Sequence, residues 1–178
     1  MAGQIYMDGL WTGALDKPEK ANDVTPFVPG QVGKEVSLPS PTNSGKLASK
    51  TWKYVRRDGA ACNAPYAVFH YSDVDDFVAG LAAAAGVPAG IFHGDDNASD
   101  VLERGVQVGN YGFLQVAGTS LVQCGAGVAA GDALMSMNNG TVDTATAGIP
   151  VIGIALEAVG ATLANHVTVL LDIPRLTR

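Results

Sequence analysis

Charged residues are scarce in this chain of 178 residues, at 16%, whereas a soluble domain usually carries about a quarter. Hydrophobic residues reach 47%, which is enough to form a packed core. A lone soluble domain normally keeps more charge on its surface for solubility. The shortage of charge therefore favours burial of part of the surface against other subunits, and we expect a homo-oligomer.

Basic residues are rarest in the second part of the chain. Residues 1–70 hold eight Lys/Arg and six Asp/Glu, a net +2, whereas residues 71–178 hold three Lys/Arg and eleven Asp/Glu, a net −8. An acidic surface is repelled by a phosphate backbone, so we expect no nucleic-acid partner. Arg56 and Arg57 beside Trp52 and Tyr54 could stack on single-stranded bases, but so few cations favour a surface strand or a strand facing a protein partner.

Cysteine and histidine are also too few for the usual metal and catalytic motifs. The two cysteines, Cys62 and Cys124, form no CxxC pair, and we expect two reduced, buried thiols. His70, His93 and His166 lack a partner at ligand spacing, and His70 reads as a structural histidine of a strand. With no hydrolase elbow, HExxH or phosphate-loop string, we predict no catalytic residue, metal or cofactor, and a protein that is not an enzyme.

A secretory leader and a membrane span are not predicted either. The start, MAGQIYMDGLW, has no basic segment followed by an apolar run. The apolar stretch near 77–87 is too short to cross a bilayer. We expect no membrane partner and synthesis in the cytoplasm.

Two loops imitate ligand-binding motifs. Gly125–Ala130 fits the loose dinucleotide pattern GxGxxG/A, but Gly131 and Asp132 interrupt the helix that must follow, so a turn is favoured. The acidic loop 95–100 has the composition of a calcium loop but lacks glycine at the sixth position and glutamate at the twelfth. An adventitious divalent ion there is a minor alternative.

Residues 1–50 are interrupted by five prolines and predict an extended N-terminal arm, with one short strand at 34–38. Such an arm is either a loose tail or a segment that orders on a partner, with Trp11, Phe27 and Val28 as anchors. Residues 51–178 form the second predicted unit, a β-rich domain.

That second unit shows short strand-like runs separated by turns. Runs at 51–57, 66–71 and 87–92 are followed by others between Gly105 and Leu171, and eleven of the 22 glycines lie in 105–160. Asn139-Gly140 predicts a tight hairpin and Gly118 a turn. Ser72, Asp75, Asp76 and Gly86 favour one short helix over 73–85, although Gly80 weakens it. The fold class is mainly β, a small antiparallel barrel or sandwich with an extended arm.

The order of these elements resembles the head decoration (capsid cement) proteins of tailed bacteriophages. The resemblance covers about residues 51–174 and rests on short strings in a fixed order. These are Tyr54-Val55-Arg56-Arg57-Asp58, Pro88-Ala89-Gly90-Ile91, the Gly131-Asp132 turn, the Gly140-Thr141-Val142 hairpin, the strand from Ile152 to Glu157, and a closing Val-Thr-Val-Leu-Leu strand at 167–171. The chain departs from that family in its longer N-terminal segment and the helix expected over 73–85.

The resemblance implies a structural virion protein, assembled in the host cytoplasm, that binds the outer surface of a capsid. It would bridge neighbouring major capsid protein subunits, commonly as a trimer. Contacts with the partner are expected from six residues of the first third of the chain, four aromatic, one aliphatic and one basic, namely Trp11, Phe27, Trp52, Tyr54, Val28 and Arg56. The alternative is a virion surface spike or carbohydrate-binding module, for which Tyr111 and Phe113 are the candidate loop aromatics.

Overall fold

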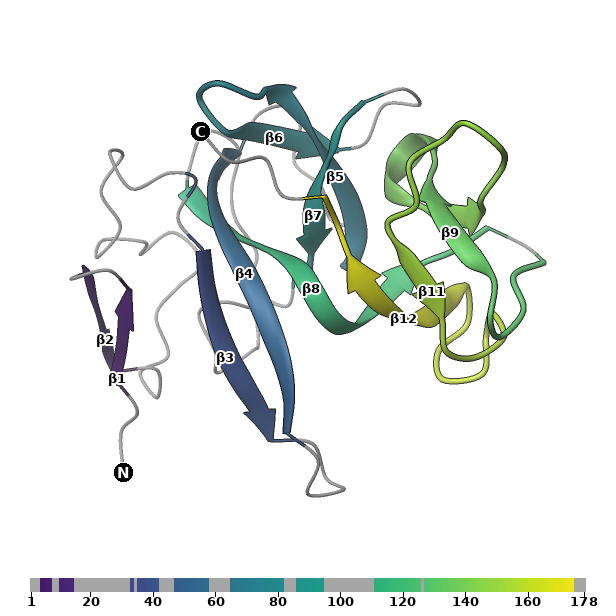
Figure 1. Ribbon diagram of the computed structural model, residues 1–178, viewed down its shortest axis with the longest axis horizontal. Helices are drawn as coiled ribbons and strands as arrows, with labels where there is room; N and C mark the ends of the chain where they lie inside the picture. Colours follow the sequence, from purple (N-terminus) through teal and green to yellow (C-terminus); the bar gives the residue numbers. More distant parts are fainter. Residues whose placement is uncertain are drawn as a thin grey trace.

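The computed structural model describes residues 4–7, 10–14, 33, 35–41, 47–57, 65–81, 86–94, 111–125 and 127–174. Within these ranges the protein is mainly β, as the sequence predicts, and it contains no α-helix. No helix among these residues is long and apolar enough to cross a membrane. One ten-stranded sheet contains most of the strands, and a separate hairpin pairs β1 (Gln4–Met7) with β2 (Leu10–Ala14) (Figure 1).

Five strands of the large sheet pair in a ring, which we call the barrel. They are β4 (Leu47–Arg57), β5 (Ala67–Asp73), β6 (Val78–Leu81), β7 (Pro88–Phe92) and β8 (Tyr111–Gln123). The order around the ring is β8-β7-β5-β6-β4, and β4 pairs back onto β8. Two of the closing contacts are short: β7 meets β8 at Ile91 and Gln115, and β4 meets β6 over two residue pairs in parallel. The barrel is therefore antiparallel except at β4–β6.

The remaining C-terminal strands extend the sheet from β8, and we call them the lobe. They are β9 (Ala133–Ser136), β10 (Val142–Thr144), β11 (Gly153–Ala155) and β12 (His166–Asp172). Their order outward from β8 is β12, β11, β9 and β10. In Figure 1 they lie on the right of the molecule, beyond β8.

Strand β8 serves both parts. Its first half pairs with β4 from Tyr111 to Ala117, and its second half pairs with β12 from Ala117 to Gln123. The expected turn at Gly118 is wrong, because Gly118 adopts φ +89° within one continuous strand. A left-handed φ suits glycine and bends the strand without ending it.

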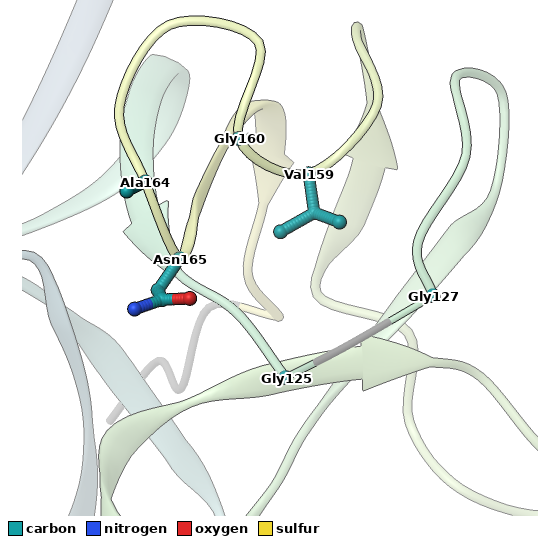
Figure 2. A pocket seen from close by; sticks show the side chains of 6 residues that line it. All are labelled: Gly125, Gly127, Val159, Gly160, Ala164 and Asn165. Atoms are coloured by element: carbon teal, nitrogen blue, oxygen red, sulfur yellow. The ribbon is translucent and has the colours of Figure 1, made fainter.

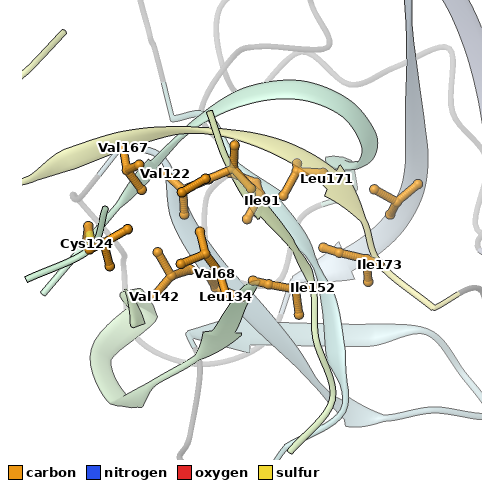
Figure 3. Packing of buried hydrophobic residues seen from close by; sticks show 14 residues of the cluster. Val68, Ile91, Val122, Cys124, Leu134, Val142, Ile152, Val167, Leu171 and Ile173 are labelled. Carbon is orange, nitrogen blue, oxygen red and sulfur yellow. The ribbon is translucent and has the colours of Figure 1, made fainter. Parts of the chain in front are cut away.

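Two clusters of buried residues form the core. The barrel cluster contains Phe69, Phe92 and Leu114, with Phe69 and Phe92 stacked at 4.9 Å between ring centroids. The second cluster fills the lobe and continues into the barrel (Figure 3), where Val68 and Ile91 meet the lobe residues Leu134, Val142, Ile152, Val167 and Leu171. Because the second cluster spans both parts, barrel and lobe share part of their core.

Cys124 is also a member of the shared cluster and is a free, buried thiol, as the sequence predicts. Burial, with the nearby Asp143 carboxylate, raises its pKa. Cys62 lies outside the described residues.

The helix expected over 73–85 is wrong for the residues that the structure describes. Asp73 Oδ1 accepts hydrogen bonds from the backbone N–H groups of Asp75 and Asp76, at 3.0 and 3.1 Å. This is the hydrogen bonding of a helix N-cap, but only one turn follows, because Phe77 takes φ +51° and the chain then enters β6. A capping aspartate such as Asp73 suits both the start of a helix and a tight turn between strands. Here the pairing of β5 with β6 favours the turn.

The Asn139-Gly140 hairpin prediction is confirmed. The short 3₁₀ turn Asn138–Gly140 joins β9 to β10, and both Asn139 and Gly140 have positive φ, at 63° and 79°. A Cβ placed on Gly140 would lie 2.8 Å from the side chains of Ala67 and Leu81. The hairpin tip of the lobe is therefore seated directly on β5 and β6 of the barrel.

The strand expected at 34–38 is β3 (Glu35–Pro41), which pairs with β4 along its whole length. It belongs to the large sheet, together with the first residues of β4. The predicted arm of residues 1–50 thus contributes one edge strand to the body. Within the described residues, the β1–β2 hairpin pairs with no other strand.

Candidate functional site

Three of the predicted contact residues lie together on β4. Trp52 and Tyr54 are 2% and 0% exposed, whereas Arg56 is exposed. Trp52 packs against His93 at 4.7 Å between ring centroids, and Tyr54 packs against Phe113 at 5.3 Å. The two rings therefore contact other side chains of this chain, and of the three only Arg56 is open to a partner.

The other predicted contacts cannot be placed as side chains. Trp11 lies in β2, but its side chain is not among the described parts of the structure. Phe27 and Val28 lie outside the described residues. Of the aromatic pair expected for a carbohydrate-binding module, Phe113 is 2% exposed and packs on Tyr54, so it is no loop aromatic. Tyr111 begins β8, and its side chain lies outside the described residues.

Two cations are buried on the opposite face of β4, which the sequence does not predict. Lys53 Nζ lies 3.1 Å from Glu35 Oε1 and 5.3 Å from the centroid of the Phe77 ring. Arg57 lies 5.0 Å from the Phe92 ring and 5.4 Å from the Phe69 ring. Aromatic faces stabilise such cations. With Arg57, Trp52 and Tyr54 all turned into the fold, β4 is not a platform for stacking nucleobases.

The three histidines make hydrogen bonds to other residues of this chain in the described structure. His70 Nε2 is 2.8 Å from Ser136 Oγ, which ties β5 to β9, and this confirms the structural interpretation of His70. His93 Nε2 is 2.8 Å from Gln115 Oε1 and 3.3 Å from Ser120 Oγ. His166 Nδ1 is 2.8 Å from the carbonyl oxygen of Ala164. No group of three or more potential metal ligands occurs in the described part of the chain, and the loop 95–100 lies outside it.

The pattern at Gly125–Ala130 borders an open pocket of about 380 Å³. After Gly127 the chain runs through a turn into β9, so the helix of a dinucleotide site is missing, as expected. Figure 2 shows the two glycines facing Val159 and Asn165 across the pocket. The amide of Gly125 donates to the carbonyl of Val142, and that of Gly160 donates to His166. Among the described lining residues only Asn165 has a polar side chain, and none is charged.

The lobe also carries an exposed apolar surface, which is separate from the sites described above. Ile154 on β11 and Leu170 on β12 are direct register partners, 47% and 48% exposed. Leu156, 49% exposed, extends the same row, because its amide donates to the carbonyl of Thr168. We call Ile154, Leu156 and Leu170 the apolar face. Ile152 has the same place in the alternation as Ile154 and Leu156, but it is buried.

The apolar face exists because small residues occupy the inward positions of β11. Gly153 and Ala155 point to the core, and a Cβ on Gly153 would lie 2.6 Å from the carbonyl oxygen of Leu170. Close approach of β12 therefore requires glycine at this position. The small residues of β11 thus admit the neighbouring strand closely, and the larger side chains lie on the outer side.

Comparison with known proteins gives a structural likeness but no match in sequence. No protein-family model and no curated protein sequence matches the chain. Among solved structures, the chain is similar to the N base of the head fiber gp8.5 of bacteriophage phi29. The two share 22% identity over 71% of this chain and 98% of that one, with a TM-score of 0.46. A likeness at this level does not carry that protein's role over to this chain.

Proposed function

We propose that the protein is a structural component of a phage virion that binds the outer surface of the assembled capsid. The proposal includes stabilisation of the shell by bridging neighbouring major capsid protein subunits, as a homo-oligomer. It rests on the resemblance of residues 51–174 to head decoration proteins and on one observation from the structure. That observation is an exposed apolar face on a lobe with little charge.

Most of the short strings behind this resemblance lie close together in the structure. The Gly131-Asp132 turn, the Gly140 hairpin, the β11 strand and the closing β12 strand all pack into one lobe around a shared core. Asp132 Oδ2 accepts hydrogen bonds from the Ala129 amide and the Thr144 hydroxyl, at 2.9 and 3.2 Å, and so fixes the first of these turns. Four of the six strings that carry the resemblance are thus parts of the lobe, whereas the other two contribute to the barrel strands β4 and β7.

Binding alone accounts for these features. Each copy would hold its shell site modestly, and an oligomer that engages several subunits would gain from effective concentration. Uncharged, partly apolar surface is suited to the centre of such an interface. No catalytic step enters the proposal.

The test uses purified capsids of the phage prepared with and without this protein. The protein added back should co-sediment with capsids to saturation and should raise the temperature at which they release their DNA. Binding without any gain in heat or dilution stability would refute the bridging role, and absence of binding would refute the proposal as a whole. An unrelated acidic protein of similar size serves as the control for trapping in the pellet.

A further inference from the structure

The tip of the β9–β10 hairpin holds the one Asn-Gly pair of the sequence, Asn139-Gly140. An asparagine loses its side-chain amide when the backbone nitrogen of the next residue attacks its Cγ atom. Glycine in that next position leaves the attacking nitrogen unhindered, because it has no side chain. Asn139 is exposed, so water and base reach it. The pair therefore has both the residue types and the access to solvent that this reaction requires.

The backbone of the folded hairpin keeps the two reacting atoms apart. Asn139 has φ 63° and ψ 21°. At this ψ the Gly140 nitrogen nearly eclipses the Asn139 nitrogen, whereas attack on Cγ requires it to eclipse Cβ. Reaction needs the two atoms in contact and aligned. The peptide unit between Asn139 and Gly140 must therefore rotate through a large angle before the attack begins.

Packing against the barrel opposes that rotation. Gly140 is buried, and a Cβ placed on it would lie 2.8 Å from the side chains of both Ala67 and Leu81. The hydrogen bond between His70 Nε2 and Ser136 Oγ, at 2.8 Å, also holds β9 to β5 near the tip. Gly140 therefore turns only when the tip of the hairpin lifts off β5 and β6.

We propose that Asn139 is a site of spontaneous deamidation that stays closed while the hairpin is seated on the barrel. When the tip lifts, the Gly140 nitrogen forms a bond to Cγ of Asn139. The Cγ–Nδ2 bond breaks, and the amide leaves as ammonia with the proton of the Gly140 nitrogen. Water then opens the cyclic imide and returns a proton to that nitrogen. Opening at Cγ gives aspartate, and opening at the main-chain carbonyl gives isoaspartate.

The two products differ in their effect on the hairpin. Aspartate leaves the main chain unchanged and tolerates the positive φ of this position, so the hairpin reseats. Isoaspartate inserts the Cβ atom into the main chain, so the tip no longer has the length of the seated turn. Formation of isoaspartate therefore makes the opening of the hairpin irreversible. The inference is independent of the proposed function.

The experiment follows conversion of Asn139 by peptide mapping and mass spectrometry, while the full-length protein is incubated at mildly alkaline pH. The folded protein should convert at least about tenfold more slowly than the same protein kept unfolded in urea, because only open hairpins react. Equal rates in the two samples would show that the fold does not restrain Asn139. Absence of conversion in urea would show that Asn139 is not a modification site.

A pair of leucine variants tests whether the seat on the barrel keeps the site closed. Leu81→Ala removes a side chain beside Gly140 and should speed conversion in the folded protein by about threefold or more. The matched control is Leu163→Ala, which truncates a leucine of similar exposure, 46% against 44%, outside the hairpin and its seat. Thermal unfolding shows that both variants are folded. If Leu81→Ala reacts no faster than Leu163→Ala, contact with the barrel is not what restrains the reaction.

Melting temperatures compare the two products. Ion exchange separates converted from unconverted protein, because deamidation adds a negative charge. Protein enriched in isoaspartate at position 139 should melt about 2 °C or more below the original. The variant Asn139→Asp, which carries the same charge on an unchanged main chain, should melt close to the original. If the isoaspartate form melts like Asn139→Asp, the reaction does not hold the hairpin open.

Discussion

At the scale of single residues, the least expected group is the polar network around Gln115. This side chain is 0% exposed and donates from Nε2 to the carbonyls of Ala117 and Thr119, at 3.0 and 3.1 Å. Its Oε1 meets His93. The bonds fall where β8 leaves β4 and joins β12, so the Gln115 side chain ties together the two halves of the bent strand.

We expect Gln115→Leu to lower the free energy of unfolding by about 2–4 kcal/mol, because it removes the buried hydrogen bonds of the Gln115 amide to Ala117, Thr119 and His93. Urea denaturation followed by tryptophan fluorescence measures the change. Gln123→Leu, on the same strand but only half-buried, is the control and should cost less than about 1 kcal/mol. Equal losses in the two variants would show that the network is not the cause.

Glu157 ties the connection before β12 to that strand. Hydrogen bonds from Thr168 and then Thr162 lower the pKa of its carboxyl. A carboxyl with a lowered pKa in the folded state stabilises the fold above its unfolded pKa, about 4.3, and loses that contribution as the pH falls through the folded value. The charged form of Glu157 therefore contributes to stability at neutral pH and not in acid.

Glu157→Gln should accordingly melt at a lower temperature than the original protein at pH 7, and the two should converge as the pH falls below about 4. Thermal unfolding followed by circular dichroism at pH 7 and pH 3 measures the gap. A gap that is as large at pH 3 as at pH 7 would contradict the assigned role of the charge.

At the scale of strands and turns, the β9–β10 hairpin depends on Gly140 for two separate reasons. Its φ of +79° disfavours other residues, and its missing Cβ leaves room for Ala67 and Leu81. Gly148 has a similar φ of +87°, but nothing lies within 4 Å of a Cβ placed there. Comparing the same substitution at the two positions therefore separates the cost of backbone strain from the cost of steric overlap.

Gly148→Ala should cost about 1 kcal/mol from backbone strain alone. Gly140→Ala should cost about 2–4 kcal/mol, because overlap with the barrel adds to the same strain. Chemical denaturation of both variants gives the difference. If Gly140→Ala is no worse than Gly148→Ala, the hairpin does not press on β5 and β6 as described.

Strand positions could be predicted where residues alternate between clear breaks. Pro65 and the Gly/Pro pairs around 86–90 bound the strands at 66–71 and 87–92, and the structure has β5 and β7 there. Asp73 shows why the helix over 73–85 could not be excluded, since one capping side chain serves a helix start and a tight turn alike. Gly118 bends β8 where the sequence predicts an interruption, because pairing on both halves outweighs a local break.

Candidate site residues were harder to predict, because tertiary packing decides which of them are buried. Trp52 and Tyr54 look like exposed anchors in an alternating basic strand, yet both faces of β4 are buried from Thr51 to Val55. The apolar face was visible only as a run of large and small residues in 151–157. Which side faces outward depends on the distance from β12 to Gly153, and that distance is set by tertiary packing.

At the scale of the whole molecule, the contribution of the N-terminal segment can be separated from that of the body. The β1–β2 hairpin pairs with neither barrel nor lobe among the described residues, whereas β3 is an integral edge of the sheet. The boundary for a truncation therefore lies before β3, and not at residue 50.

A protein lacking residues 1–32 should unfold at nearly the same temperature as the full chain, since the ten-stranded sheet is intact. If Trp11, Phe27 and Val28 anchor the arm on the shell, the truncated protein should co-sediment with capsids more weakly than the full chain, by tenfold or more. Calorimetry and co-sedimentation measure the two effects. Unchanged binding would remove the arm from the mechanism.

Strand β8 makes barrel and lobe inseparable in folding. If the lobe opened, the second half of β8 would lose its β12 partner, and Val68 and Ile91 would lose their cover from the shared core. Neither part therefore reaches its own stable intermediate, and the chain has to gain or lose both in one cooperative transition. Many of the required pairings also join segments distant along the chain, which makes that transition slow. At a given stability, slow folding implies slow unfolding, so we expect the protein to survive brief heating, a kinetic durability distinct from the depth of its free-energy minimum.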